Sequence, residues 1–165
     1  MERFSLGHLR ELHRNLELNK SVTETNEAMV IEILRVIAEM VVYGDSKSEM
    51  LFDFFCEKNM LALFLEIMWT ETGCPIKVHI QILQTLGILV NSVRNDTSLY
   101  YLLSNNYINE ILIHPHDFQG KGRQSNDGTN TLIRTADEEN LCDQYVSFMK
   151  SLSLRLDEKT VQFFF

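Results

Sequence analysis

Apolar residues recur at spacings of three and four along most of the chain, the pattern of helices that bury one face. The first such stripe, over 5–18, is formed by Leu6, Leu9, Leu12 and Leu16. A longer apolar stripe follows over 26–43. Gly44 is predicted to end that helix, because only glycine adopts the left-handed C′ conformation without a side-chain clash. The chain therefore begins with a short helix and then a long one.

The start of the long helix is marked by candidate capping residues. Ser21 and Glu24 have the spacing of a capping box, and Thr23 is a second N-cap candidate. Two shorter helices are predicted next, over 48–56 and 60–69.

Gly73 ends this first block, and Pro75 is suited to open another helix, because the first helical residue needs no partner for its NH group. The segment 75–93 is apolar almost all round, so we expect it to be central. Asp96 or Thr97 then caps a short helix over 97–105.

Another short helix is predicted over 107–113, and a third long one from about Asp137 to Leu156. Acidic residues at 137–139 favour a helix N-terminus through its dipole. A last short helix should begin at 160–165. The order of one long and two short helices therefore recurs along the chain.

The successive blocks of helices can be aligned at fixed offsets in residue number. At an offset of 47 positions, Phe52 and Phe55 coincide with Leu99 and Leu102. At an offset of 63 positions, Leu86 coincides with Met149. Units of roughly 40–47 residues are typical of armadillo and HEAT repeats, which stack because no unit buries its apolar face alone. We predict an all-α, armadillo/HEAT-like right-handed solenoid of about two and a half repeats plus an N-terminal helix; an irregular helical bundle is the alternative.

Aromatic clusters recur at corresponding points of the three blocks, in FDFF at 52–55, LYY at 99–101 and FFF at 163–165. We expect them to pack between successive repeats, with peptide binding as the alternative. The predicted inter-repeat core consists of Phe52, Phe54, Phe55, Leu86, Leu99, Tyr100, Tyr101, Leu102, Met149, Phe163 and Phe164. The three terminal Phe residues would leave apolar surface open, so we expect the chain to be the first part of a longer protein or half of an assembly.

One domain is predicted over 1–165, with a flexible loop insertion at 114–135. In this loop His114, His116 and Asp117 could hold a divalent metal, but a solvated loop is the favoured interpretation. Gly120 to Arg123 could meet a phosphate, although such a Gly-rich segment more often indicates disorder. The sequence contains no GxGxxG, GxxxxGK[ST] or HExxH motif. We predict no enzyme, no cofactor and no metal site.

The charge balance limits which classes of partner the chain is expected to bind. The chain has 15 basic and 23 acidic residues, a formal charge of −8, which argues against nucleic acid. The three cysteines are widely spaced and form neither a disulfide framework nor a zinc cluster, which favours a reducing cytosolic compartment. Lys77 and His79 interrupt the most apolar stretch, so no membrane span is expected.

Several segments carry a resemblance to a known family. FDFFCEKNM at 52–60, LLSNNYIN at 102–109 and SFMKSLSLRLDEKTVQFFF at 147–165 are similar to the FPL domain family, at the N-terminal region of endosomal-maturation-like proteins. SLGHLRELHRNL at 5–16 and RVIAEMVVYGD at 35–45 fit in the same order. The resemblance covers nearly the whole chain.

This resemblance implies an armadillo-like helical domain at the start of a larger cytosolic protein. Family members are non-enzymatic scaffolds in endosome-to-lysosome trafficking and autophagy, including mitophagy in animals and vacuolar or Golgi trafficking in plants. It also implies protein partners from the trafficking machinery, among them a RING-type ubiquitin ligase. Association with endosomal, lysosomal, vacuolar or Golgi membranes is expected to be indirect, because anionic leaflets repel an acidic chain. The alternative is a purely structural segment that supports later repeats and binds nothing.

Overall fold

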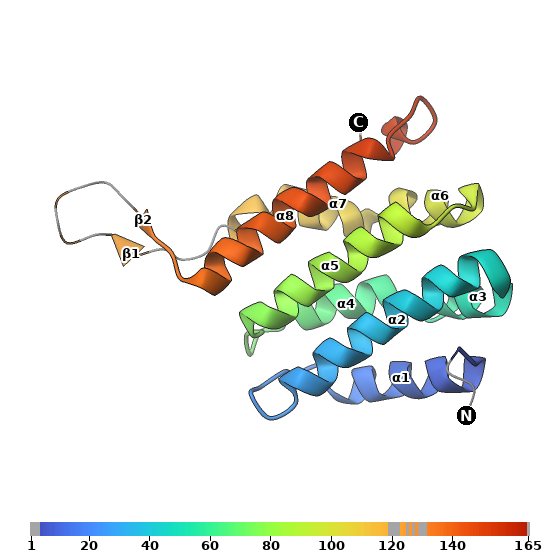
Figure 1. The fold of residues 1–165 in the computed structure, drawn as a ribbon, viewed down its shortest axis with the longest axis horizontal. Coiled ribbons are helices and arrows are strands. Elements are labelled where there is room, and N and C mark those ends of the chain that lie inside the picture. The colour runs from blue at the N-terminus through green and yellow to red at the C-terminus, as the bar shows by residue number, and fades with distance from the viewer. Residues whose placement is uncertain (1–3, 119–122, 125, 127, 129–131, 165) are drawn as a thin grey trace.

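The computed structural model describes residues 4–118, 123, 124, 126, 128 and 132–164. Three long helices, α2 (Glu27–Lys47), α5 (Ile76–Ser92) and α8 (Ala136–Leu154), lie side by side in one layer (Figure 1). Behind them lie the short helices α3 (Glu49–Glu57), α4 (Met60–Met68), α6 (Asp96–Ser104) and α7 (Asn106–Ile113). Helix α1 (Leu6–Leu18) packs against α2 and α3 at the N-terminal edge.

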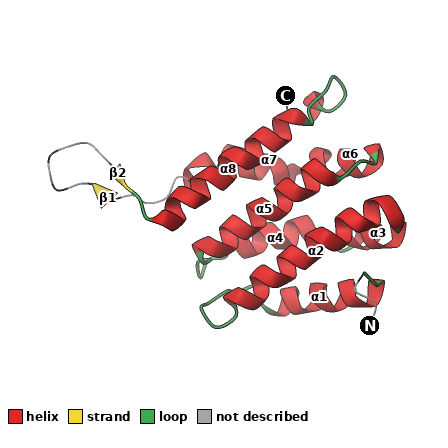
Figure 2. Ribbon diagram, in the orientation of Figure 1, coloured by secondary structure: helices red, strands yellow, loops and turns green. Residues whose placement is uncertain are grey.

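The all-helical class is confirmed for the described part of the chain. The strands found there are β1 (Arg123–Gln124) and β2 (Leu132–Ile133), which pair antiparallel beside the start of α8 (Figure 2). The order of one long and two short helices occurs as α2–α3–α4 and again as α5–α6–α7. Within the described residues no helix combines the length and the apolar content that a bilayer crossing requires.

Gly44 does not end the second helix, so this prediction was wrong. Helix α2 continues to Lys47, with Gly44 buried inside it. A Cβ on Gly44 would lie 2.7 Å from Leu51 Cβ and 3.2 Å from the backbone nitrogen of Phe52. The glycine is therefore needed for the close approach of α3 to α2, and not for a left-handed turn.

The helix caps also differ from the predicted ones. Asn26, and neither Ser21 nor Thr23, stands at the N-cap of α2, and Asn95 caps α6 by accepting from the backbone NH of Thr97. Helix α8 begins one residue before the predicted Asp137. Its N-cap, Thr135, forms a capping box with Glu138, in which each side chain accepts from the other residue's backbone NH.

The apolar core runs through both layers and is continuous across the units. Phe55 and Phe64 are fully buried between the layers, and α5 contributes buried side chains on several faces, as expected for the central helix. Fully burying one such side chain contributes roughly 1.5–3 kcal/mol. The core therefore depends on the stacking of successive units and not on any one of them.

The predicted loop at 114–135 contains ordered structure at both ends. Pro115–Phe118 forms a 3₁₀ helix, η1, and Phe118 is buried with its ring stacked on Tyr145 of α8 at a centroid distance of 4.7 Å. An aromatic side chain at the start of this segment thus anchors it against the third long helix. The predicted last helix over 160–165 is a short 3₁₀ turn, η2 (Val161–Phe163), and Phe165 lies outside the described residues.

Candidate functional site

The three aromatic clusters meet one another in sequence order. Phe52 of α3 contacts Tyr101 of α6 edge-on, with ring centroids 6.2 Å apart. Tyr100, the neighbouring residue, contacts Phe163 of η2 at 6.3 Å. Each cluster therefore touches the next along the layer of short helices, where successive units join.

Most of the predicted inter-repeat residues lie in this region. Those that are buried are Phe52, Phe54, Phe55, Leu86, Leu99 and Leu102, and those that are half-buried are Tyr100, Tyr101, Phe163 and Phe164. Met149 differs from the expectation, because its side chain is 39% exposed. Phe148 and Leu152 occupy the inner face of α8, and the helical rotation turns Met149 away from it.

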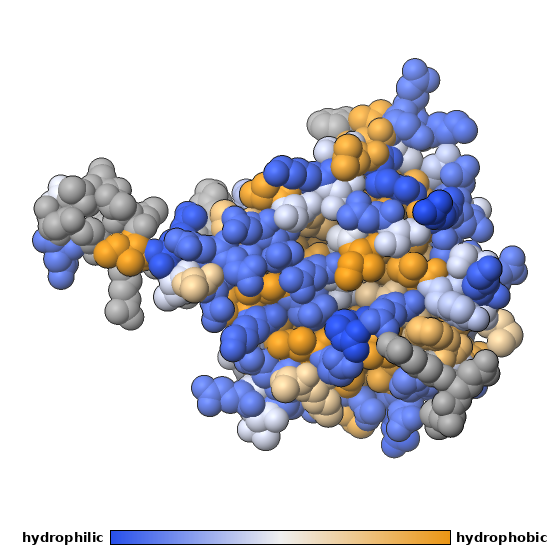
Figure 3. Space-filling view, viewed as in Figure 1, coloured by the Kyte–Doolittle hydropathy of each residue, from blue (hydrophilic) through white to orange (hydrophobic). Residues whose placement is uncertain are grey.

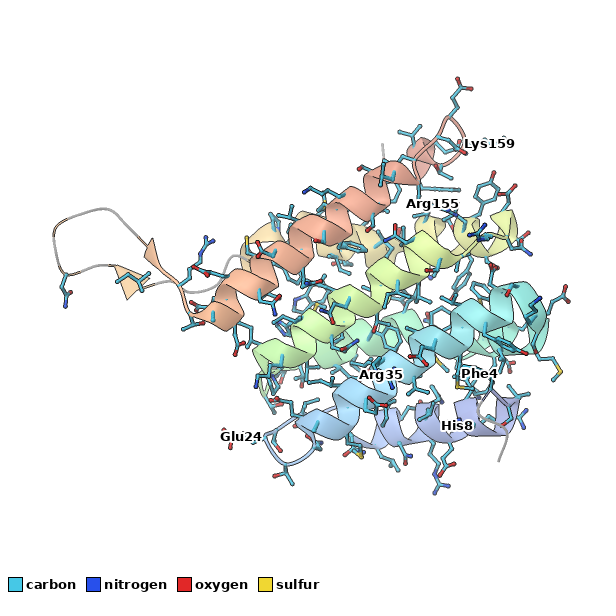
Figure 4. All side chains as sticks on the ribbon, viewed as in Figure 1. Phe4, His8, Glu24, Arg35, Arg155 and Lys159 are labelled. Atoms are coloured by element: carbon cyan, nitrogen blue, oxygen red, sulfur yellow. The ribbon has the colours of Figure 1, made fainter. Side chains whose placement is uncertain are left out.

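Polar contacts join the same units. The Asn59 side chain at the α3–α4 turn donates to the hydroxyl of Tyr107 in α7 at 3.0 Å. The Asp45 carboxylate accepts from the backbone NH groups of Arg94 and Asn95 at 2.8 and 3.3 Å. Arg155, labelled at the end of α8 in Figure 4, donates to the carbonyl of Val93 at 2.6 Å. The contacts of Asp45 and Arg155 join the C-terminal ends of the three long helices to one another.

Burial keeps the thiols of two cysteines protonated at neutral pH. Desolvation raises the pKa of Cys56 to about 11 and that of Cys74 to about 12. Desolvation also raises the pKa of Tyr101, to about 12. None of these three groups is an activated nucleophile or base.

The metal and phosphate candidates gain no support from the described residues. Among these, no three His, Cys, Asp or Glu side chains gather as a metal site would need. The His114 ring nitrogen Nδ1 lies 2.8 Å from the carbonyl oxygen of Glu110, one helical turn earlier. Gly120, Lys121 and Gly122 lie outside the described residues.

A groove between α5 and α8 opens on the face formed by the long helices. Its volume is about 240 Å³. Every lining residue is uncharged: Leu83, Gln84, Gly87, Ile88 and Asn91 from α5, and Gln144, Ser147, Phe148 and Ser151 from α8. At one end, the Asn91 amide donates to the Ser151 hydroxyl at 2.8 Å and so bridges the two helices.

The surroundings of this groove are polar. Figure 3 shows apolar surface in bands between polar ridges that follow the long helices. On α2 such a ridge carries Arg35, labelled in Figure 4, which pairs with both Glu32 and Glu39. The α5–α8 groove is thus an uncharged strip on a strongly acidic chain.

A second groove, of about 310 Å³, lies between α3 and α6. Asp45, Glu49 and Asp53 line it together with the rings of Phe52 and Tyr101. One Asp45 oxygen already holds the start of α6, so part of this acidic character serves the fold. Neither groove was predicted from the sequence. The one sequence signal for the α5–α8 groove is Gly87, a glycine within an otherwise helical, apolar segment.

Comparison with known proteins identifies relatives of the whole chain. A family model named FPL, described as an uncharacterised conserved protein, matches residues 34–165. "Protein CLEC16A homolog" from Drosophila melanogaster is 43% identical over 163 residues, 99% of this chain and 14% of that protein. "Protein CLEC16A" from Homo sapiens is 41% identical over 161 residues, 98% of this chain and 13% of the relative.

A plant protein is also similar. "Protein TRANSPARENT TESTA 9" from Arabidopsis thaliana is 33% identical over 160 residues, 97% of this chain and 17% of the relative. The chain thus spans less than a fifth of the length of these three relatives. No solved structure matches it.

Proposed function

Because the chain belongs to the FPL family, we propose that it is a non-enzymatic interaction domain of a regulator of endosome–lysosome membrane trafficking and autophagy. The observation that carries this proposal is the match of the family model to residues 34–165. The trafficking role comes from the family resemblance. The binding role is supported by a layer of long helices with an uncharged groove on its face.

We further propose that the helices form an armadillo-like right-handed solenoid. Supporting this, two blocks of one long and two short helices are followed by a third long helix. Such solenoids bind through an extended surface formed by successive helices, without a deep pocket. Both grooves are shallow and lie between helices of neighbouring units, as this mode of binding requires.

The partners in this proposal are proteins of the trafficking machinery, with a RING-type ubiquitin ligase among them by family resemblance. Contact with membranes would pass through these partners, because a formal charge of −8 is repelled by anionic lipid headgroups.

A purely structural role is the second candidate. Helix α8 exposes Val146, Met149 and Leu154 by 43%, 39% and 82%, although it belongs to the same layer as α5. A segment that only supports further helices would show such a face.

Exchange of this chain into a relative tests the function. The matched segment of the Drosophila relative is replaced by this chain in cells that lack their own protein, and delivery of a reporter to lysosomes is measured. We expect rescue by the chimera, and no rescue when Leu86→Glu unfolds the domain. Proximity labelling of the chimera should then recover endosomal and lysosomal proteins. Rescue that persists without residues equivalent to 1–165 would contradict an interaction role.

A further inference from the structure

Gly87 has no packing role in α5. Glycine is disfavoured in a helix interior, since it gives up the most backbone freedom on folding. A Cβ on Gly87 would meet no atom within 4 Å beyond its own helix and chain neighbours, whereas a Cβ on Gly44 would collide with α3. The close approach of two helices thus explains Gly44 and leaves Gly87 unexplained.

The space above Gly87 is the α5–α8 groove. Ile88, 42% exposed, lies beside it, and Phe148 forms part of the opposite wall. The half-buried side chains of Gln84 and Gln144 line the same groove from the two helices. Neither of these amides makes a hydrogen bond to another described residue. The groove therefore combines a notch without a side chain, apolar walls and two available amides.

We propose that this groove binds an extended peptide segment of a partner protein, with the peptide main chain crossing α5 at Gly87. This inference rests on the proposed function and names the chemistry of the partner. A peptide main chain offers alternating NH and C=O groups, and a glutamine amide can donate to one and accept from the other. Glycine is the residue that lets a backbone approach most closely.

The uncharged lining selects the kind of segment. A charged peptide would lose hydration in this groove without gaining an ion pair, so neutral segments with small apolar side chains are favoured. A helix is about 10–12 Å across with its side chains. The main-chain NH and C=O groups of such a helix already bond one another, so only an extended segment offers them to the side chains of Gln84 and Gln144.

Selection from a phage-displayed library of random nine-residue peptides on the intact chain tests the proposal. The selected peptides are synthesised, and their dissociation constants are measured by fluorescence anisotropy at low and high salt. We expect neutral peptides whose affinity changes by less than about twofold with salt, because no charge lines the groove. Gly87→Leu should weaken binding by about tenfold or more, as expected when a filled notch blocks a central contact.

Gly7→Leu is the matched control, because a Cβ at Gly7 also has space and the residue lies in α1, outside the groove lining. It should leave affinity within about twofold of the original chain. Leucine is a better helix former than glycine, so the melting temperature of Gly87→Leu should not fall, and measuring it separates lost binding from unfolding.

Three results with selected peptides would overturn the proposal: peptides that bind Gly87→Leu equally well, basic peptides whose binding high salt abolishes, or peptides that become helical when bound. The second result would assign binding to the acidic α3–α6 groove. In each of these three results the chain still binds peptides, so the groove proposal fails but the proposed interaction function does not. Failure to select any peptide would also overturn the groove proposal, whereas the proposed function fails only if the chimera above does not restore lysosomal delivery.

Discussion

Helices α5 and α8 hold the same position in successive units, yet they differ in how much of their surface is buried. Leu83 and Leu86 of α5 are each 1% exposed. Their equivalents 63 positions later, Val146 and Met149 of α8, are 43% and 39% exposed. Both pairs are apolar, so the difference does not come from residue type.

On their opposite faces, α5 and α8 bury equivalent residues to a similar extent. Thr85 of α5 is buried and donates to the carbonyl of Leu34 in α2, and its equivalent Phe148 is buried beside the α5–α8 groove. Leu89 of α5 and its equivalent Leu152 of α8 are buried as well. Helix α5 has a long neighbour on each side, whereas among the described residues α8 has one on a single side. The repeat pattern thus encodes which side chains can be buried, and the number of neighbours decides which are.

The largest expected effect comes from placing a charge at equivalent positions of the two helices. Leu86→Glu would bury an unpaired carboxylate in the centre of the core and should cost roughly 4 kcal/mol or more, enough to unfold much of the chain. Met149→Glu should change the free energy of unfolding by no more than about 0.5 kcal/mol, because the side chain can reach water. Urea denaturation followed by circular dichroism measures both.

The two variants carry the same new charge in the same type of helix, so each is the other's control. Equal losses of stability would show that the outer face of α8 is covered in solution, and the contrast between the two helices would fail.

Residue patterns alone predicted the α-helices of the described part but not what each of them packs against. The stripes of apolar residues located all eight α-helices of the described part, because burial on one face imposes the helical period. They could not show that Gly44 lies under Leu51, since a glycine required by close packing and one required by a turn look the same in sequence. They also placed Met149 in the core, because a repeat offset cannot tell a central unit from an edge unit.

The groove was beyond sequence reasoning for a similar reason. Gln84 and Gln144 lie 60 positions apart, and neither stands in a recognisable motif. Only the packing of α8 on α5 brings them to the same opening. The uncharged character of the strip likewise depends on which faces of two helices meet.

A smaller effect on stability is expected from the N-termini of α5 and α8. Helix α8 begins with the Thr135–Glu138 capping box, whereas α5 begins after Pro75 with no side-chain cap. Thr135→Ala removes the acceptor for the backbone NH of Glu138 and should destabilise the chain by about 1 kcal/mol. Thermal denaturation gives the value, and Thr135→Ser, which keeps the hydroxyl, is the control. A loss of stability with serine as large as with alanine would mean that the hydroxyl is not the stabilising group.

The smallest expected effect is a pH dependence located on α5. Desolvation lowers the pKa of His79, and its ring Nε2 lies 2.8 Å from the carbonyl oxygen of Met68. Because the unfolded chain then binds protons more readily, stability should be complete above the unfolded pKa of about 6.5 and decline as the pH falls towards the lower folded value. Desolvation also lowers the pKa of His13, so that residue contributes in the same direction.

Urea titrations at a series of pH values between neutrality and about 5 measure this decline, the range in which histidine titrates. His79→Gln should make the curve flatter than that of the original chain, and His13→Gln should remove a separate part of the slope. Because the buried residues of α8 are Leu141, Phe148 and Leu152, none of which titrates, an added Phe148→Leu substitution should lower the whole curve without changing its slope. If His79→Gln leaves the slope unchanged, the imidazole of His79 is not desolvated. Helix α5 would then be less enclosed than its position between α2 and α8 implies.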